Sequence, residues 1–133
     1  MESKVARDWL DALARTANAK DFTAHMDLIS KQVQVFGVPG FEVIGYDDWA
    51  RQCQHEFEQG ILARVSYSGM KVQAMTPGRV MFKTLETLEP TTGESQTQGV
   101  EIVIVQENDG TWRVTQERVL SPEESTFDGL VSQ

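Results

Sequence analysis

The segment "NDGTWRVTQERVLS" (108–121) decides how this chain folds. "NDG" is a tight-turn signal, and the residues after it alternate as in a strand that closes a hairpin. One side of that strand begins with Trp112 and Val114, which are apolar. The same side ends with Gln116 and Arg118, which are polar. A strand face that changes in this way predicts a cavity whose polar end the last residues line.

The rest of the chain supplies a sheet for this strand and helices to cover it. Apolar residues at helical spacing predict helices over about 4–17, 22–29 and 46–59. A short strand is predicted near 32–37, and a meander over 62–76, 79–89, 97–107 and 112–120, with turns at "TPGR" and "PTTGES". Helices followed by an antiparallel meander predict an α+β fold, with the three N-terminal helices packed on one face of the sheet.

The composition excludes several classes of protein. The chain has 133 residues, which suits one domain, and a net charge of −8. Such acidity argues against binding nucleic acid or an anionic membrane, because both need a basic surface. Cys53 is the single cysteine, so no internal disulfide can form, and the first residues lack the apolar core of a signal peptide. We therefore expect a soluble cytoplasmic protein, with one domain over 1–121 and a flexible tail over 122–133.

Both faces of the predicted sheet contain apolar residues. If every turn closes symmetrically, one face is smooth and aliphatic, and we assign it to a homodimer interface. The alternative is a face with a few tolerated exposed aliphatic side chains. The predicted interface residues are Met70, Val72, Met81, Leu85, Val100, Ile102 and Ile104.

The other face is predicted to meet the helices and to form the pocket. In the symmetric register Glu101 lies across from Arg118 and also across from Thr84. Charges buried in a pocket must be paired or hydrogen-bonded, so Glu101 and Arg118 are expected to pair there.

The order of these segments resembles the nuclear transport factor 2-like superfamily, also called the cystatin-like cone. The resemblance covers roughly residues 4–121 and lies closest to the polyketide cyclase-like and ketosteroid isomerase-like branch. It is carried by "NAKDF" (18–22), "VQVFGVPG" (33–40), "GYDDWARQ" (45–52) and "DGTWRV" (109–114). The resemblance implies a strongly bent sheet around helices, a central conical pocket and, usually, a homodimer through the outer sheet face.

The catalytic residues of that superfamily are only partly matched in this sequence. By resemblance, the position of the ketosteroid isomerase-like tyrosine falls at Leu13, that of its aspartate base at Gly37, and that of its second acid at or near Glu101. Without the tyrosine and the base, proton shuttling of that kind is not supported. The chain is also similar to the calcium/calmodulin-dependent kinase association-like domains, whose two alternating histidines fall at Gln116 and Arg118.

Three residues are candidates for chemistry: Glu101 with Arg118 as a pair, and His25 as a general base. The alternatives are a structural ion pair and a partly exposed histidine. Cys53 is expected in the core, and no metal or cofactor site is predicted. The predicted pocket-lining residues are Trp9, Leu13, Tyr46, Trp49, Tyr67, Phe82, Thr84, Val103 and Gln116.

Three functions follow as hypotheses. The first is a domain that binds a small organic molecule in a mixed apolar and polar pocket without a cofactor. The second is a cofactor-free isomerase, dehydratase or cyclase that uses a pocket carboxylate. The third is a protein-interaction module, for which a pocket filled by core aromatic residues would be expected.

Overall fold

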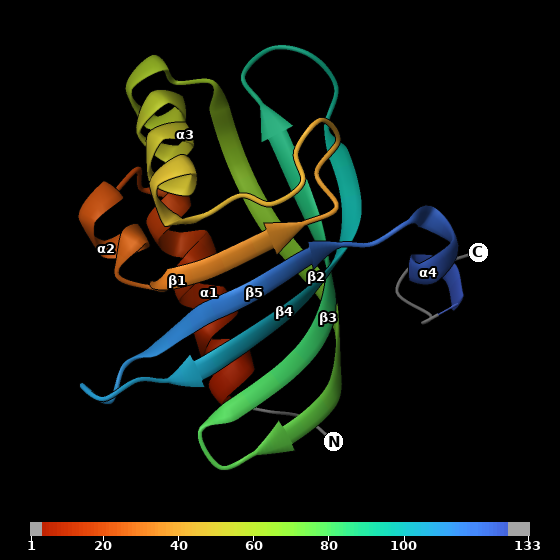
Figure 1. Cartoon of the computed structure of the whole chain (residues 1–133). Coiled ribbons are helices and arrows are strands. Elements are labelled where there is room, and N and C mark those ends of the chain that lie inside the picture. The colour runs from red at the N-terminus through yellow and green to blue at the C-terminus, as the bar shows by residue number, and fades with distance from the viewer. Residues whose placement is uncertain (1–3, 128–133) are drawn as a thin grey trace.

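A five-stranded bent sheet carries the fold, and three helices lie along one side of it (Figure 1). The structure is a computed structural model and describes residues 4–127. The elements are α1 (Lys4–Asn18), α2 (Phe22–Met26), β1 (Ile29–Phe36), α3 (Tyr46–Gln59), β2 (Leu62–Thr76), β3 (Arg79–Pro90), β4 (Gln96–Gln106), β5 (Trp112–Val119) and α4 (Pro122–Phe127). The α+β fold with three N-terminal helices on a bent sheet is confirmed.

The strands follow the order β1-β5-β4-β3-β2. Strands β2 to β5 form the expected antiparallel meander. Strand β1 pairs parallel with β5, which brings residues from the first third of the chain beside its last strand. The loop after β1 therefore begins beside the end of β5.

The core lies between α1 and the inner face of the sheet. Trp9 packs edge-to-face on Phe82, with ring centroids 6.3 Å apart, and Leu13 is 2% exposed. Burial of such large apolar side chains is the main stabilising contribution to the fold. Helix α1 presents these residues because its apolar positions repeat at helical spacing.

A β-bulge at Thr115 explains why β5 changes from apolar to polar along one side of its sequence. Val114 pairs with Ile104, whereas Gln116 pairs with Val103, so Thr115 is the extra residue in β5. Val114 is therefore fully buried on the inner face, while Gln116 and Arg118 lie on the outer face. The change from apolar to polar along one side of the sequence marks a change of face. It does not mark the polar end of a cavity, as we had predicted.

The register between β3 and β4 corrects a second prediction. Thr84 pairs with Val100 and not with Glu101. In the predicted register, an even number of residues lay between each pair of opposite residues on these two strands. In the structure Leu88 pairs with Gln96, so the number of residues between paired positions is odd. A shift of one residue turns every side chain of β4 to the opposite face.

This shift places much of the predicted dimer interface inside the protein. Val100, Ile102 and Ile104 are fully buried in the core. Met70 and Val72 also pack against the core cluster, so only Met81 and Leu85 remain on the outer face. The homodimer itself stays a prediction.

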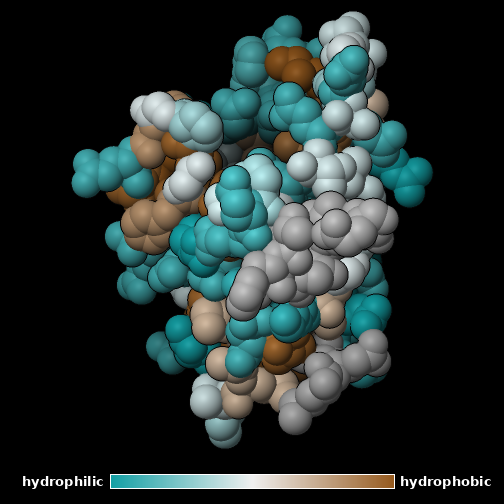
Figure 2. Space-filling model, turned by 90° about the vertical axis from the view of Figure 1, so that its right-hand side faces the viewer, coloured by the Kyte–Doolittle hydropathy of each residue, from teal (hydrophilic) through white to brown (hydrophobic). Residues whose placement is uncertain are grey.

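The outer face of the sheet is more polar than we expected. There Arg118 pairs with Glu101 at 3.4 Å, and Lys83 lies opposite Glu101. Viewed from the side on which α4 lies, the surface is mostly hydrophilic, with separate hydrophobic patches (Figure 2).

Residues 122–127, which belong to the predicted tail, form α4. Glu124 of α4 accepts hydrogen bonds from Arg118 at 3.0 and 3.1 Å, and these tie the helix to β5. The remainder of the predicted tail, 128–133, lies outside the described residues. No helix among residues 4–127 has the length and apolar character needed to cross a bilayer.

Candidate functional site

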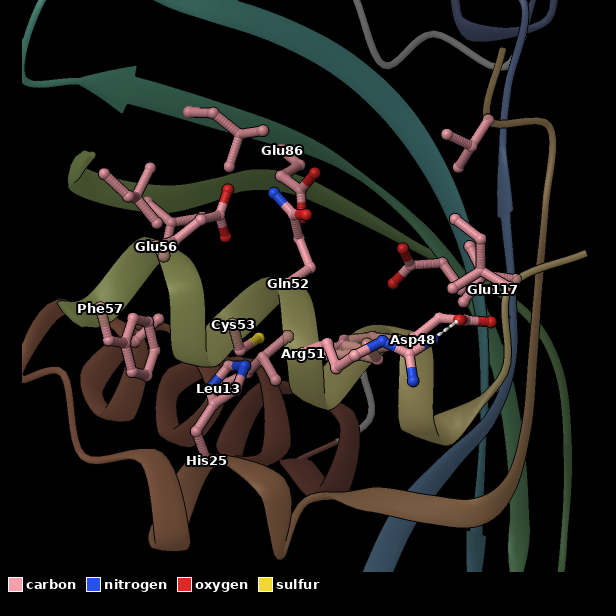
Figure 3. A pocket seen from close by; sticks show the side chains of 18 of the residues that line it. Leu13, His25, Asp48, Arg51, Gln52, Cys53, Glu56, Phe57, Glu86 and Glu117 are labelled. Atoms are coloured by element: carbon pink, nitrogen blue, oxygen red, sulfur yellow. Dashed lines mark hydrogen bonds and ion pairs between the residues drawn. The ribbon is translucent and has the colours of Figure 1, made fainter. Parts of the chain in front are cut away.

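A cavity of about 650 Å³ lies between α3 and the inner face of the sheet (Figure 3). The loop after β1 contributes Phe41 and Ile44 to its lining, and α1 contributes Leu13. The strands add the apolar side chains of Val35, Leu62, Val65 and Leu88. Most of the wall is therefore apolar, which is usual for sites that hold small organic molecules.

Helix α3 forms one wall because its apolar stripe faces inward. Gly45 precedes the helix, and the Asp48 carboxylate accepts a hydrogen bond from the Gly45 amide at 3.3 Å. Trp49, Cys53 and Phe57, which lie four residues apart on one face of α3, all line the cavity. The helix ends at Gly60, which is left-handed with φ 64°.

The sheet contributes a hydrogen-bonded acidic group. The Tyr67 hydroxyl donates to Glu86 Oε2 at 2.9 Å, and the Gln98 amide donates to Glu86 Oε1 at 3.1 Å. Burial raises the pKa of Glu86, while these two donors oppose the rise. Burial, followed by the nearby carboxylates, also raises the pKa of Tyr67.

Glu117 is the second acid of the inner face, and its carboxyl group points into the cavity (Figure 3). Burial and then the charge of Glu86 raise the pKa of Glu117 to about 8. Within residues 4–127 no group donates a hydrogen bond to Glu117. Since Glu86 has two donors and Glu117 has none, Glu117 is the carboxyl group that holds a proton at neutral pH.

His25 lies in the cavity wall but remains uncharged. Its Nδ1 lies 2.9 Å from the Thr16 hydroxyl, which itself donates to the carbonyl of Ala12 at 2.9 Å. Thr16 and Nδ1 of His25 share a hydrogen bond, whose donor is set by the tautomer of the ring. Burial lowers the pKa of His25 to about 4. The expected general base is thus in the wall, and Thr16 and Phe57 hold its ring.

Cys53 is buried and protonated. Burial and then the charge of Glu56 raise the pKa of its thiol to about 12, and a hydrogen bond involving Trp49 only partly opposes this rise. Such a thiol is a poor nucleophile, as expected for a core residue.

The mouth of the cavity carries an exposed ion pair. Arg51 bonds to Asp48 one turn earlier on α3, and both side chains are more than half exposed. Arg51 is the one positively charged residue among the described residues that line the cavity.

The predicted site residues separate into three groups. Leu13, His25, Trp49 and Tyr67 line the cavity. The prediction for the others was wrong. Glu101, Arg118, Val103 and Gln116 lie on the outer side of the sheet, because of the β3–β4 register and the bulge.

The other four predicted lining residues lie elsewhere. Trp9 and Phe82 fill the core, and Thr84 is buried with its hydroxyl bonded to the Ser68 carbonyl at 2.9 Å. Tyr46 lines a separate groove beside α2.

Sequence analysis missed the two acids that face the cavity, Glu86 and Glu117. The expected register already placed Glu86 beside Tyr67 on the pocket face, and that signal could have identified it. No pattern in the sequence marks the bulge that turns Glu117 inward. No group of three or more His, Cys, Asp or Glu side chains in the described part of the chain is arranged to hold a metal ion.

Solved structures share this arrangement at low sequence identity. A provisionally named scytalone dehydratase from Novosphingobium aromaticivorans is 11% identical, with a TM-score of 0.70 over 87% of this chain and 80% of that one. An NTF-2 like protein of unknown function from Shewanella oneidensis is 12% identical, with a TM-score of 0.74 over 90% and 98%. Aln2 from a Streptomyces species is 14% identical, with a TM-score of 0.72 over 96% and 99%. No curated protein matches the chain.

The bent sheet and its helical cover are thus the fold of these nuclear transport factor 2-like neighbours. A family model for the SnoaL-like domain matches residues 6–121, and the chain belongs to that family.

Proposed function

We propose that this protein binds a small organic molecule with a largely apolar body in the cavity beside α3. The observation that carries the proposal is a cavity of about 650 Å³ with apolar walls and a few inward polar groups. Cavities of several hundred cubic ångströms with such linings are typical ligand sites. The interaction-module hypothesis instead expected the core aromatic residues to fill this space.

Native mass spectrometry of freshly purified protein, under gentle and then denaturing conditions, tests this proposal. We expect a small molecule that is released on denaturation. A Val38→Trp variant should lose it, because Val38 lines the cavity and a larger side chain would occupy the space. Gln116→Trp, on the outer face, is the matched control and should keep it. Equal retention by both variants would contradict the cavity as the binding site.

A second candidate function is cofactor-free acid–base catalysis, which the pair Glu86 and Glu117 favours. A carboxyl group that holds a proton near neutral pH, beside one whose two hydrogen-bond donors favour its charged form, can act as an acid–base pair. On a ketone, the charged carboxylate would take a proton from the carbon next to the carbonyl, while the neutral carboxyl group donates one to the carbonyl oxygen. A structural neighbour that is provisionally named a dehydratase is consistent with chemistry of this kind.

Exchange of carbon-bound protons tests this second function. Cyclic ketones incubated with the protein in D₂O would incorporate deuterium next to the carbonyl, as measured by NMR. Glu117→Gln should reduce the exchange rate at least about a hundredfold, the usual contribution of a general acid or base. Glu101→Gln, on the outer face, should leave the rate unchanged. Exchange no faster than in buffer would leave binding as the function.

A further inference from the structure

The charges that face the cavity are strongly unbalanced. The carboxyl groups of Glu56, Glu86 and Glu117 point into the cavity from α3, β3 and β5 (Figure 3). Carboxylates held in an apolar cavity repel anions and attract cations more strongly than they would in water.

Glu117 lacks a partner that the other inner acid possesses. Glu86 accepts hydrogen bonds from Tyr67 and Gln98, whereas no residue within 4–127 donates to Glu117. A carboxyl group inside a protein that has no donor is costly, and most such groups are satisfied by a partner. The missing donor can be supplied by a ligand.

Within residues 4–127, no positively charged side chain is paired with this carboxyl group. Arg51 is bonded to Asp48 at the exposed mouth of the cavity. The remaining titratable groups of the wall are neutral at pH 7: His25 on α2, Cys53 on α3 and the hydroxyl of Tyr67 on β2.

The apolar wall is partly aromatic, which suits the same kind of ligand. Trp49, Phe57 and Tyr67 line the cavity together with these acids. Aromatic side chains pack well against apolar rings and also attract cations through their faces.

We propose that the cavity binds a protonated primary or secondary amine with an apolar body, its ammonium group bonded to Glu117 and its body against the aromatic wall. This inference rests on the proposed binding function and names the chemical class of the ligand.

The protonation state of Glu117 predicts how the affinity for the ligand depends on pH. Because the pKa of Glu117 is about 8 without ligand, an ammonium group must displace a proton to bind at neutral pH. Affinity for the amine therefore rises as pH increases from 6 towards 9. Affinity for a neutral ligand that accepts a hydrogen bond from the protonated carboxyl group falls over the same range.

Three ligands of one shape and different charge test the inference. Isothermal titration calorimetry would compare naphthylmethylamine, naphthylmethanol and naphthoate at pH 6, 7.5 and 9. We expect the amine to bind at least about tenfold more tightly than the alcohol at pH 7.5, and naphthoate to bind most weakly. Glu117→Gln should remove the preference for the amine and leave binding of the alcohol within about twofold. Glu101→Gln should keep the preference.

The outcomes separate the inference from the proposed function. Binding of the alcohol equal to or tighter than the amine overturns the amine as ligand and leaves small-molecule binding standing. A preference for the amine that survives in Glu117→Gln overturns Glu117 as its partner. If none of the three ligands binds, both the inference and the proposed function fail for molecules of this size.

Discussion

At the scale of single residues, the hydrogen bonds of Tyr67 decide how the acidic cavity wall ionises. The Tyr67 hydroxyl donates to Glu86 and so helps this buried carboxylate to keep its charge. Glu117, which lies close enough for the charge of Glu86 to raise its pKa, takes the proton instead. Two identical side chains in one cavity thus have different hydrogen-bonding environments, and the donors to Glu86 favour its charged form.

Tyr67→Phe should destabilise the protein by about 1–2 kcal/mol, since it removes one donor from a buried carboxylate and leaves the shape of the wall unchanged. Urea unfolding at pH 7 measures this difference in unfolding free energy. Tyr46→Phe is the matched control, because no hydrogen bond of the Tyr46 hydroxyl is seen in the described part of the chain. An equal effect of the two changes would show that the hydroxyl of Tyr67 contributes nothing.

Gly37 occupies a position that only glycine tolerates. Its φ is +85°, and a Cβ atom placed there would lie 2.7 Å from the carbonyl oxygen of Val119. Gly40 has nearly the same φ, +88°, but open space around its Cβ position. We expect Gly40→Ala to cost about 1 kcal/mol from backbone strain, and Gly37→Ala at least about 1 kcal/mol more from the close contact. Thermal unfolding of both variants measures the difference, and equal costs would contradict a tight contact between β1 and β5.

At the scale of elements, Asn18 joins the end of α1 to the edge strand β2. Its side chain donates to the Val65 carbonyl at 3.0 Å and accepts from the Val65 amide at 2.8 Å, as a neighbouring strand would. These bonds satisfy backbone groups on a strand that has no partner on this side.

Asn18→Ala should therefore lower the unfolding free energy by about 1–3 kcal/mol, because both backbone groups of Val65 lose their partner. Hydrogen exchange followed by NMR should show the Val65 amide exchanging faster, while amides of the central strand β4 change only with global stability. Asn108→Ala, in the exposed turn before β5, is the control with no expected effect. Unchanged protection of Val65 would disprove the strand-like role of Asn18.

The existence and order of the elements could be predicted from the sequence, but the faces of the strands could not. Helical spacing identified α1 and α3, and the turn residues at 76–79 and 108–111 located two hairpins correctly. Faces depend on register, and a register follows from alternation only when one face is polar. Here both faces carry apolar side chains, so neither the odd loop after β3 nor the bulge at Thr115 left a signal.

These two local features decide which acid enters the cavity. Without the bulge at Thr115, alternation from Val114 would have turned Gln116 inward and Glu117 outward. The symmetric register likewise turned Glu101 inward, although its true partner Arg118 was predicted correctly. On the strands the bulge and the register therefore decide which predicted residues face the cavity. On the helices Leu13, His25 and Trp49 line it, whereas Trp9 and Tyr46 do not.

At the scale of the whole molecule, we predict that a second copy binds to the outer sheet face. That face carries the half-buried Met81 and Leu85 beside the charged pair Glu101–Arg118. A C2 pair through a mixed face of this kind would cover the apolar side chains. Native mass spectrometry should then give twice 14.9 kDa for the wild type.

Met81→Lys tests the location of that interface. It places a second positive charge near Lys83 on the same face, so we expect the dimer to dissociate to a mass of 14.9 kDa. Gln52→Lys, at the cavity on the other side of the sheet, should leave the dimer intact. A dimer that survives Met81→Lys would move the interface elsewhere, and a monomeric wild type would contradict the dimer.

The stability of the whole molecule should depend on pH in a way that His25 and Glu117 determine together. Burial lowers the pKa of His25 from 6.5 to about 4, so between these values the unfolded chain binds more protons and stability rises with pH. The pKa of Glu117 is raised from 4.5 to about 8, so the folded chain binds more protons and stability falls as pH rises over that range.

Below about pH 6.5, the rise in stability with pH due to His25 opposes the fall due to Glu117. Above pH 6.5 only the fall due to Glu117 remains, and the raised pKa of Glu86 acts in the same direction. We therefore expect a nearly flat unfolding free energy from pH 5 to 6.5, and a fall of roughly 1–2 kcal/mol from pH 6.5 to 8. Urea unfolding at half-unit intervals of pH measures this curve. Glu117→Gln should flatten the alkaline part and Glu101→Gln should not, since Glu101 lies on the outer face. A wild-type stability that is constant or rises between pH 6.5 and 8 would show that Glu117 is ionised in the folded protein, and the proton donor of the cavity would have to be another group.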